Sequence, residues 1–176
     1  MQNIRPQVSE YAPYYERYIA QVPGDDVLSV LRGQAGEVER LFGRVGAGSE
    51  TFRYGPDKWT FREVAGHLTD AERVFGLRAF CFSRGERAPL PSFDENAYVE
   101  EGRYGGVSLH DLVTEFVAVR AANVAFLSRL EDDRWTRVGT ASSHAISVRA
   151  IAFIMAGHVR HHLAILDERY LPAMRS

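Results

Sequence analysis

One apolar stripe late in the chain runs into two histidines, and this feature constrains the fold more than any other. The side chains that recur there at spacings of three or four residues are Val148, Ile151, Met155, His158, His162 and Ile165. Such a period places them on one face of an α-helix. Two residues four apart on a helix have Cβ atoms roughly 5–6 Å apart, so both imidazoles can reach one metal ion.

A second segment shows the same interruption of an apolar face. Its stripe consists of Phe61, Val64, His67, Ala71 and Val74. Because both helices would turn imidazoles toward the core, we expect their faces to meet and His67, His158 and His162 to converge on a metal ion. The alternative is that each histidine is a hydrogen-bonded core residue, since an i,i+4 pair also arises by chance. The HExxH metalloprotease motif is absent from the sequence.

Length and composition predict one soluble domain over residues 1–176, with residues 1–23 as an N-terminal arm. The chain is 45% hydrophobic and 25% charged, as globular proteins are, and its net charge of −2 argues against a nucleic-acid partner. No apolar run approaches the ~18 residues of a membrane span, and the N-terminus lacks the apolar core of a signal peptide. We therefore expect a cytoplasmic protein without a membrane partner. The single cysteine, Cys81, is expected to be a small core residue.

The periodic segments predict four helices and no strong strand pattern. They begin near Asp26, Thr60, Ser108 and Ser147, and the expected ends are Gly46–Gly48, Ser83, Leu130 and Tyr170 followed by Pro172. Thr60 and Glu63 have the spacing of a capping box. A long connection, residues 84–107, is expected to be a crossover loop with a short turn near 94–99, and residues 136–145 are expected to form a loop or a hairpin. The sequence thus predicts an all-α four-helix bundle with a long crossover loop.

Three further expectations concern side chains around the bundle. The tyrosines of the arm, Tyr11, Tyr14, Tyr15 and Tyr18, are expected to pack on the helices, although they could also roof a pocket. A short helical turn is expected around residues 14–21. Asn123 interrupts the apolar stripe of the third helix and should have a hydrogen-bond partner.

Several short motifs resemble the DinB/YfiT superfamily. They are Trp59–Leu68, Glu72–Phe75 and Gly157–His162, while Pro91–Tyr98 and Gly139–Ser142 are similar to a DinB-like subgroup. The resemblance covers nearly the whole chain and implies a four-helix bundle with a three-histidine metal site at His67, His158 and His162. Characterised relatives include thiol transferases that use low-molecular-weight thiols and a mycothiol-dependent isomerase, and others are described only as metal-dependent hydrolases.

Three imidazole ligands leave a divalent ion with open coordination positions, which is typical of catalytic sites. Zinc or nickel would suit these ligands, and the ion could activate water or a low-molecular-weight thiol against a small-molecule substrate. Asp70, one turn after His67, and His144, in a loop, are candidate bases, whereas His161 is expected to be exposed. The alternatives are a non-catalytic metal-binding module and a structural bundle without metal. A homodimer is also expected.

Overall fold

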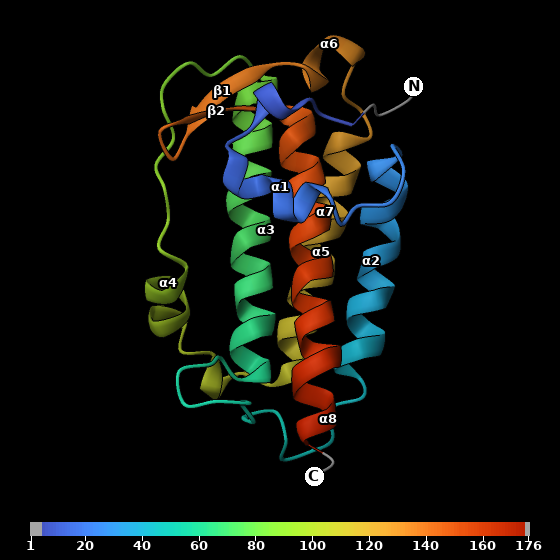
Figure 1. Ribbon diagram of the computed structural model, residues 1–176, viewed down its shortest axis with the longest axis vertical. Coiled ribbons are helices and arrows are strands. Elements are labelled where there is room, and N and C mark those ends of the chain that lie inside the picture. The colour runs from blue at the N-terminus through green and yellow to red at the C-terminus, as the bar shows by residue number, and fades with distance from the viewer. Residues whose placement is uncertain (1–4, 175–176) are drawn as a thin grey trace.

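Four long helices lie side by side in the computed structural model, which describes residues 5–174 (Figure 1). They are α2 (Val27–Phe42), α3 (Phe61–Ser83), α5 (Leu109–Leu127) and α7 (Val148–Ile165). The predicted all-α four-helix bundle is confirmed. Within residues 5–174, none of the helices combines the length and the apolar composition that a membrane span requires.

Side-chain caps fix the starts of three long helices, as the sequence predicts. The Thr60 hydroxyl accepts a hydrogen bond from the amide of Glu63, and the Glu63 carboxylate accepts one from the amide of Thr60. Ser108 and Ser147 cap α5 and α7 in the same way, through their side-chain oxygens. These bonds satisfy amide groups that the first turn of a helix leaves without partners.

Helices that are consecutive in sequence do not all lie next to each other. Both α5 and α7 pack along α2 and along α3, so α2 and α3 occupy opposite corners of the bundle. The chain between α3 and α5 contains α4 (Glu95–Gly102) and a 3₁₀ turn, Tyr104–Gly106. This crossover packs against α3, which it covers on one side (Figure 1).

A polar layer cuts the core of the bundle into two apolar clusters. Each long helix contributes to both clusters, and buried polar side chains lie close to the point where its two contributions meet. The buried polar residues of this layer are Gln34, His67, Glu72, Arg120 and His158. The histidines therefore lie at the middle of the bundle, where facing helices build metal and cofactor sites.

The shorter elements refine the predicted chain. The arm contains 3₁₀ turns at Val8–Glu10 and Pro13–Tyr15 followed by α1 (Glu16–Ile19). After α6 (Asp132–Trp135), the segment that could be a loop or a hairpin forms an antiparallel hairpin of β1 (Val138–Ala141) and β2 (His144–Ser147). The arm and this hairpin lie together near one end of the bundle (Figure 1).

Two predicted helix ends need correction. The apolar stripe of α2 continues to Val45, but the helix ends at Phe42, because the amides of Arg44 and Val45 bond to carbonyls three residues earlier instead of four. At the other end of the chain, α7 passes into a π-helical turn, Leu166–Tyr170, and then into α8 (Leu171–Ala173). Pro172 does not stop the helical path at once, because the first turn of a helix tolerates a proline.

Candidate metal centre

Three histidines meet between α3 and α7. The Nε2 atom of His158 lies 3.0 Å from Nε2 of His67 and 3.1 Å from Nε2 of His162. The nitrogen atoms that the three residues can offer to an ion all lie within 4.8 Å of one another. The structure thus brings together the three histidines that the sequence predicted to converge.

The donor set of this group fits a divalent ion. At bonds of about 2.0–2.1 Å, two nitrogens on a tetrahedral ion would be about 3.3 Å apart, close to the two observed separations. A single N–H on His158 could not serve both neighbouring Nε2 atoms, whereas an ion can accept all three lone pairs. These residues could therefore hold zinc, nickel or a similar ion through nitrogen atoms alone.

Burial keeps the three imidazoles neutral near pH 7. It lowers the pKa of His67 to about 4. Burial also lowers the pKa of His158 and of His162 well below the usual value, and the neighbouring histidines lower both further. Neutral imidazole is the form that offers a lone pair to a metal ion, so the site is prepared for a cation.

Aromatic rings hold the histidines from two sides. The Trp59 ring lies 4.6 Å from the His67 ring and, nearly parallel, 6.4 Å from the His162 ring. Nδ1 of His67 is buried and has no hydrogen-bond partner among residues 5–174, so packing against Trp59 orients this ring. From the arm, the Tyr18 ring lies edge-on, 5.4 Å from the rings of both His158 and His161.

The prediction that His161 is exposed is wrong. Its ring is half-buried against Tyr18, and burial lowers its pKa. The arm explains the difference, because α1 packs along α7 and covers a face that helical periodicity alone assigns to solvent. His161 is nevertheless not one of the three histidines that converge.

Two cavities flank the histidine group. The larger, of about 350 Å³, is lined by His158, Phe75 and the arm tyrosines Tyr14, Tyr15 and Tyr18. The smaller, of about 220 Å³, is lined by His162 and Trp59. Glu95 and Asn96, at the start of α4, line both cavities. The arm tyrosines thus wall a cavity in addition to packing on the bundle.

The candidate bases lie in different surroundings. The Asp70 carboxylate accepts a hydrogen bond from the Tyr104 hydroxyl, and burial raises the pKa of Asp70 although this bond lowers it. Asp70 thus links α3 to the crossover segment through this hydrogen bond. His144 is exposed on β2, opposite Ala141. A role as base stays a prediction for both residues.

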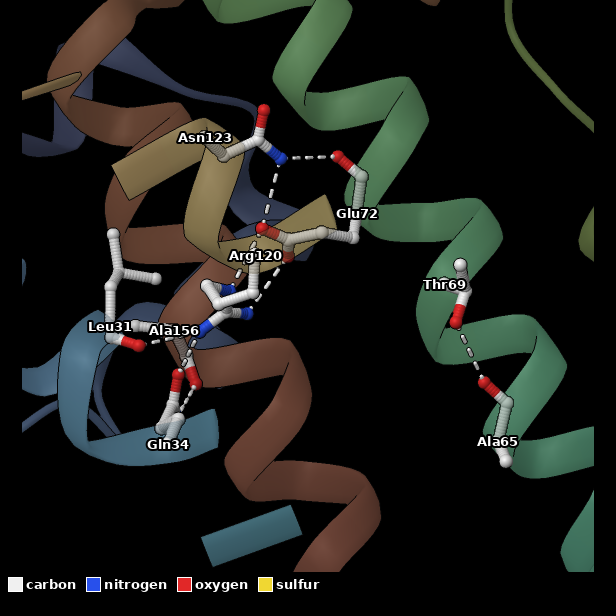
Figure 2. A network of polar contacts seen from close by, with 8 residues as sticks. All are labelled: Leu31, Gln34, Ala65, Thr69, Glu72, Arg120, Asn123 and Ala156. Carbon is white, nitrogen blue, oxygen red and sulfur yellow. Dashed lines mark hydrogen bonds and ion pairs between the residues drawn. The ribbon is translucent and has the colours of Figure 1, made fainter. Parts of the chain in front are cut away.

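Some residues at or near the site were not predicted from the sequence, because they lie in the crossover or on other helices. Glu95 and Asn96 stand in the Pro91–Tyr98 stretch that resembles a DinB-like subgroup, and this was the available signal. A second missed group lies beside the histidines: Arg120 pairs with Glu72 at 2.8 Å and donates to Gln34 (Figure 2). Asn123 donates to Glu72, which confirms that it has a partner.

Comparison with known proteins agrees with this geometry. The model of the DinB superfamily matches residues 31–166. The chain belongs to the DinB superfamily. Among solved structures, this DinB protein is similar to YfiT from Bacillus subtilis, with 18% identity and a TM-score of 0.77 over 98% of this chain and 94% of that chain. YfiT is described as a probable metal-dependent hydrolase with an unusual four-helix bundle topology. A comparison of this chain with curated proteins found no match.

Proposed function

We propose that this protein is an enzyme that depends on a divalent metal ion, zinc or nickel, and acts on a small-molecule substrate. His67, His158 and His162 would be the ligands. The observation that carries the proposal is the convergence of three neutral imidazoles, two buried and one half-buried, whose ring nitrogens lie within 4.8 Å of one another. A divalent ion held by three imidazoles supplies a Lewis acid with open coordination positions, which suits hydrolysis or the activation of a thiol.

The residues around the site would bind the substrate and limit water. His158 is 5% exposed and faces the larger cavity, so a substrate there would meet the site beside this ligand. Glu95 and Asn96 would face a substrate in either cavity, and the Glu95 carboxylate is a candidate to accept a proton. The aromatic rings of the arm and of Trp59 would exclude water from the reacting group.

The two cavities favour thiol transfer as a second candidate beside hydrolysis. A hydrolase needs room for one organic substrate, whereas a transferase binds a thiol and an electrophile together. The smaller cavity, next to His162, would take a low-molecular-weight thiol, and the larger one, next to His158, would take the electrophile. An aryl halide consumed only when a small thiol is present would favour transfer, whereas ester or amide cleavage without thiol would favour hydrolysis.

Elemental analysis of protein purified without a metal-affinity tag tests the metal site. We expect about one divalent ion per chain in wild type and none in His158→Ala. His110→Ala is the matched control, because His110 is exposed on α5 and away from the cluster, and it should retain the ion. Wild-type protein that carries no ion and takes up neither zinc nor nickel would overturn the proposal in favour of core histidines. Protein that binds the ion but converts no tested substrate would favour the alternative, a non-catalytic metal-binding module.

We also propose a homodimer. Leu77 and Phe80 leave apolar surface exposed on α3, at 57% and 47%. Light scattering on purified protein measures the mass of the particle, and a mass of one chain at all concentrations would contradict the dimer.

A further inference from the structure

A buried arginine lines the larger cavity beside His158. Arg78, on α3, is only 3% exposed. Its Nη2 atom donates to the carbonyl of Pro91 at 2.8 Å and to the hydroxyl of Ser142 at 3.1 Å. Both acceptors are neutral, and within residues 5–174 Arg78 forms no ion pair with a carboxylate, in contrast to the buried pair of Arg120 and Glu72.

An unpaired charge at this depth needs an explanation. Removing a guanidinium from water costs several kcal/mol unless a counter-charge or hydrogen bonds compensate it. Hydrogen bonds to the neutral oxygens of Pro91, Ser142 and Tyr15 compensate only in part, because an arginine has five N–H donors and none of these acceptors carries a charge. A carboxylate would match the guanidinium in charge and in bidentate geometry.

The wall between Arg78 and the histidines is aromatic. The Phe75 ring lies 6.2 Å from the His158 ring, and the Arg78 guanidinium carbon lies 5.8 Å from the centre of the same Phe75 ring. Phe93 and Tyr15 line the cavity beside them. A ligand that reaches from Arg78 to His158 would therefore run along aromatic rings, which favour an apolar or aromatic body.

We propose that the larger cavity binds a substrate with a carboxylate, which pairs with Arg78, and an apolar or aromatic body, which lies along Phe75 and the arm tyrosines. The reacting group would then stand beside His158. This last step rests on the proposed metal-dependent function, whereas the binding of the carboxylate to Arg78 does not.

The acidic residues of the same cavity do not cancel the charge of Arg78. Asp94 and Glu95 also line it, but both are exposed. The Asp94 carboxylate already accepts hydrogen bonds from two amides at the start of α4. Water and salt screen exposed charges, whereas a buried guanidinium acts through a medium of lower dielectric. Arg78 is therefore the buried charge that a carboxylate in this cavity would meet.

Calorimetric titration of the metal-free, full-length protein tests this inference without any activity. The probes are phenylacetate, 3-phenylpropionate and 4-phenylbutyrate, each beside its amide. We expect at least one acid to bind about tenfold or more tightly than its amide, because only the acid forms charge-assisted bonds with Arg78. If no acid binds, or if acids and amides bind alike, the inference is overturned even where the metal analysis succeeds.

Three variants separate the charge of Arg78 from its structural bonds. Arg78→Met should abolish the preference for the acid, and Arg78→Lys should retain part of it. Ser142→Ala removes a structural bond but keeps the charge, so the preference should survive. Arg84→Met is the matched control, because Arg84 is an exposed arginine at the end of α3. This variant should bind the acids and amides as wild type does. If Ser142→Ala loses the preference as completely as Arg78→Met, Arg78 only joins α3 to the crossover and the hairpin turn, and the inference fails.

Discussion

The backbone of Tyr18 lies directly against Gly157, and a Cβ atom on residue 157 would overlap the Tyr18 carbonyl. Because glycine has no side chain, α1 can press onto α7 at this point. The residue after Gly157 is His158, whose ring lies 5.4 Å from the Tyr18 ring. The close approach of two backbones therefore places the arm over the candidate metal centre.

Replacing Gly157 by alanine should displace the arm and destabilise the protein. We expect a loss of about 1–3 kcal/mol in the free energy of unfolding, the usual cost of an added methyl group in a packed contact. Urea denaturation measures the loss, and limited proteolysis between Tyr11 and Pro23 measures the release of the arm.

Gly33→Ala is the matched control for this substitution. Gly33 lies within α2, is exposed, and would meet nothing within 4 Å if it carried a Cβ atom. Alanine there should raise stability by up to about 1 kcal/mol, because glycine is a poor helix former. If Gly157→Ala behaves like this control, the contact with Tyr18 does not hold the arm.

The buried pair of Glu72 and Arg120 should be costly to break. Their side chains are 2% and 1% exposed, so Arg120→Met would leave the Glu72 carboxylate buried without its cation. We expect a loss of about 3–5 kcal/mol in the free energy of unfolding. Urea denaturation measures it, and the loss would include the bond from Arg120 to Gln34, which donates in turn to the Ala156 carbonyl (Figure 2).

An exposed ion pair between the same two helices provides the comparison. Arg73 and Glu115 are 50% and 46% exposed, and Arg73→Met should cost no more than about 1 kcal/mol. The double variant Glu72→Leu with Arg120→Met should lose less than Arg120→Met alone, since it leaves no unpaired charge. Equal costs for Arg120→Met and Arg73→Met would contradict the account of the polar layer.

The sequence predicts the four helices well because their starts and buried faces are local properties. Thr60 with Glu63 specifies the start of α3, and the apolar period specifies its inner face. The diagonal placement of α2 and α3 is not local, because connections of this length allow several helix orders. Glu72 and Arg120 escape prediction for a similar reason: a charged residue on a helix is usually exposed, and its partner here is 48 positions away.

The residues around the candidate site also fall into those that the sequence predicts and those that it does not. The i,i+4 spacing and the interrupted apolar faces predict that His158 and His162 meet His67, and the structure shows these three together. Arg78 and Glu95 could not be assigned to the site from spacing, because their surroundings are built by the crossover and the hairpin turn. Helices reveal their buried face through a periodic pattern of apolar residues, whereas loops have no such pattern from which their conformation could be predicted.

Acid should weaken the attachment of the arm through Glu10. Its carboxylate accepts hydrogen bonds from Ser147 and Arg149. Burial raises the pKa of Glu10, but these bonds outweigh burial and hold its pKa below the ordinary 4.5. As the pH falls, the unfolded chain therefore takes up this proton first. The stabilisation is complete above about pH 4.5 and is lost as the pH falls through the lower pKa of the folded state.

Glu10→Gln isolates this contribution. Wild type should be more stable than the variant near pH 7, and the difference should vanish in acid, as measured by urea denaturation at a series of pH values. Glu39→Gln, at an exposed position of α2, should show no such convergence. A constant difference between wild type and Glu10→Gln at every pH would rule out the ion pair as its source.

Metal binding should be visible in the fluorescence of Trp59. The chain has two tryptophans, so Trp135→Phe leaves Trp59 as the single reporter, 4.6 Å from the ring of His67. An open-shell ion such as Ni²⁺ should quench its emission, with a break at about one equivalent if three histidines form one site. Zinc added first should protect the emission, because zinc is closed-shell and would occupy the same ligands.

Two variants decide whether this quenching reports the three-histidine site. His158→Ala in the Trp135→Phe background removes the ligand that lies between the other two, so the break at one equivalent should disappear. Trp59→Phe leaves only Trp135, which is buried in the apolar cluster on the far side of the polar layer, and its emission should not respond. Stoichiometric quenching that persists in His158→Ala would place the ion elsewhere, because a site that keeps full affinity without its central ligand is not built from these histidines.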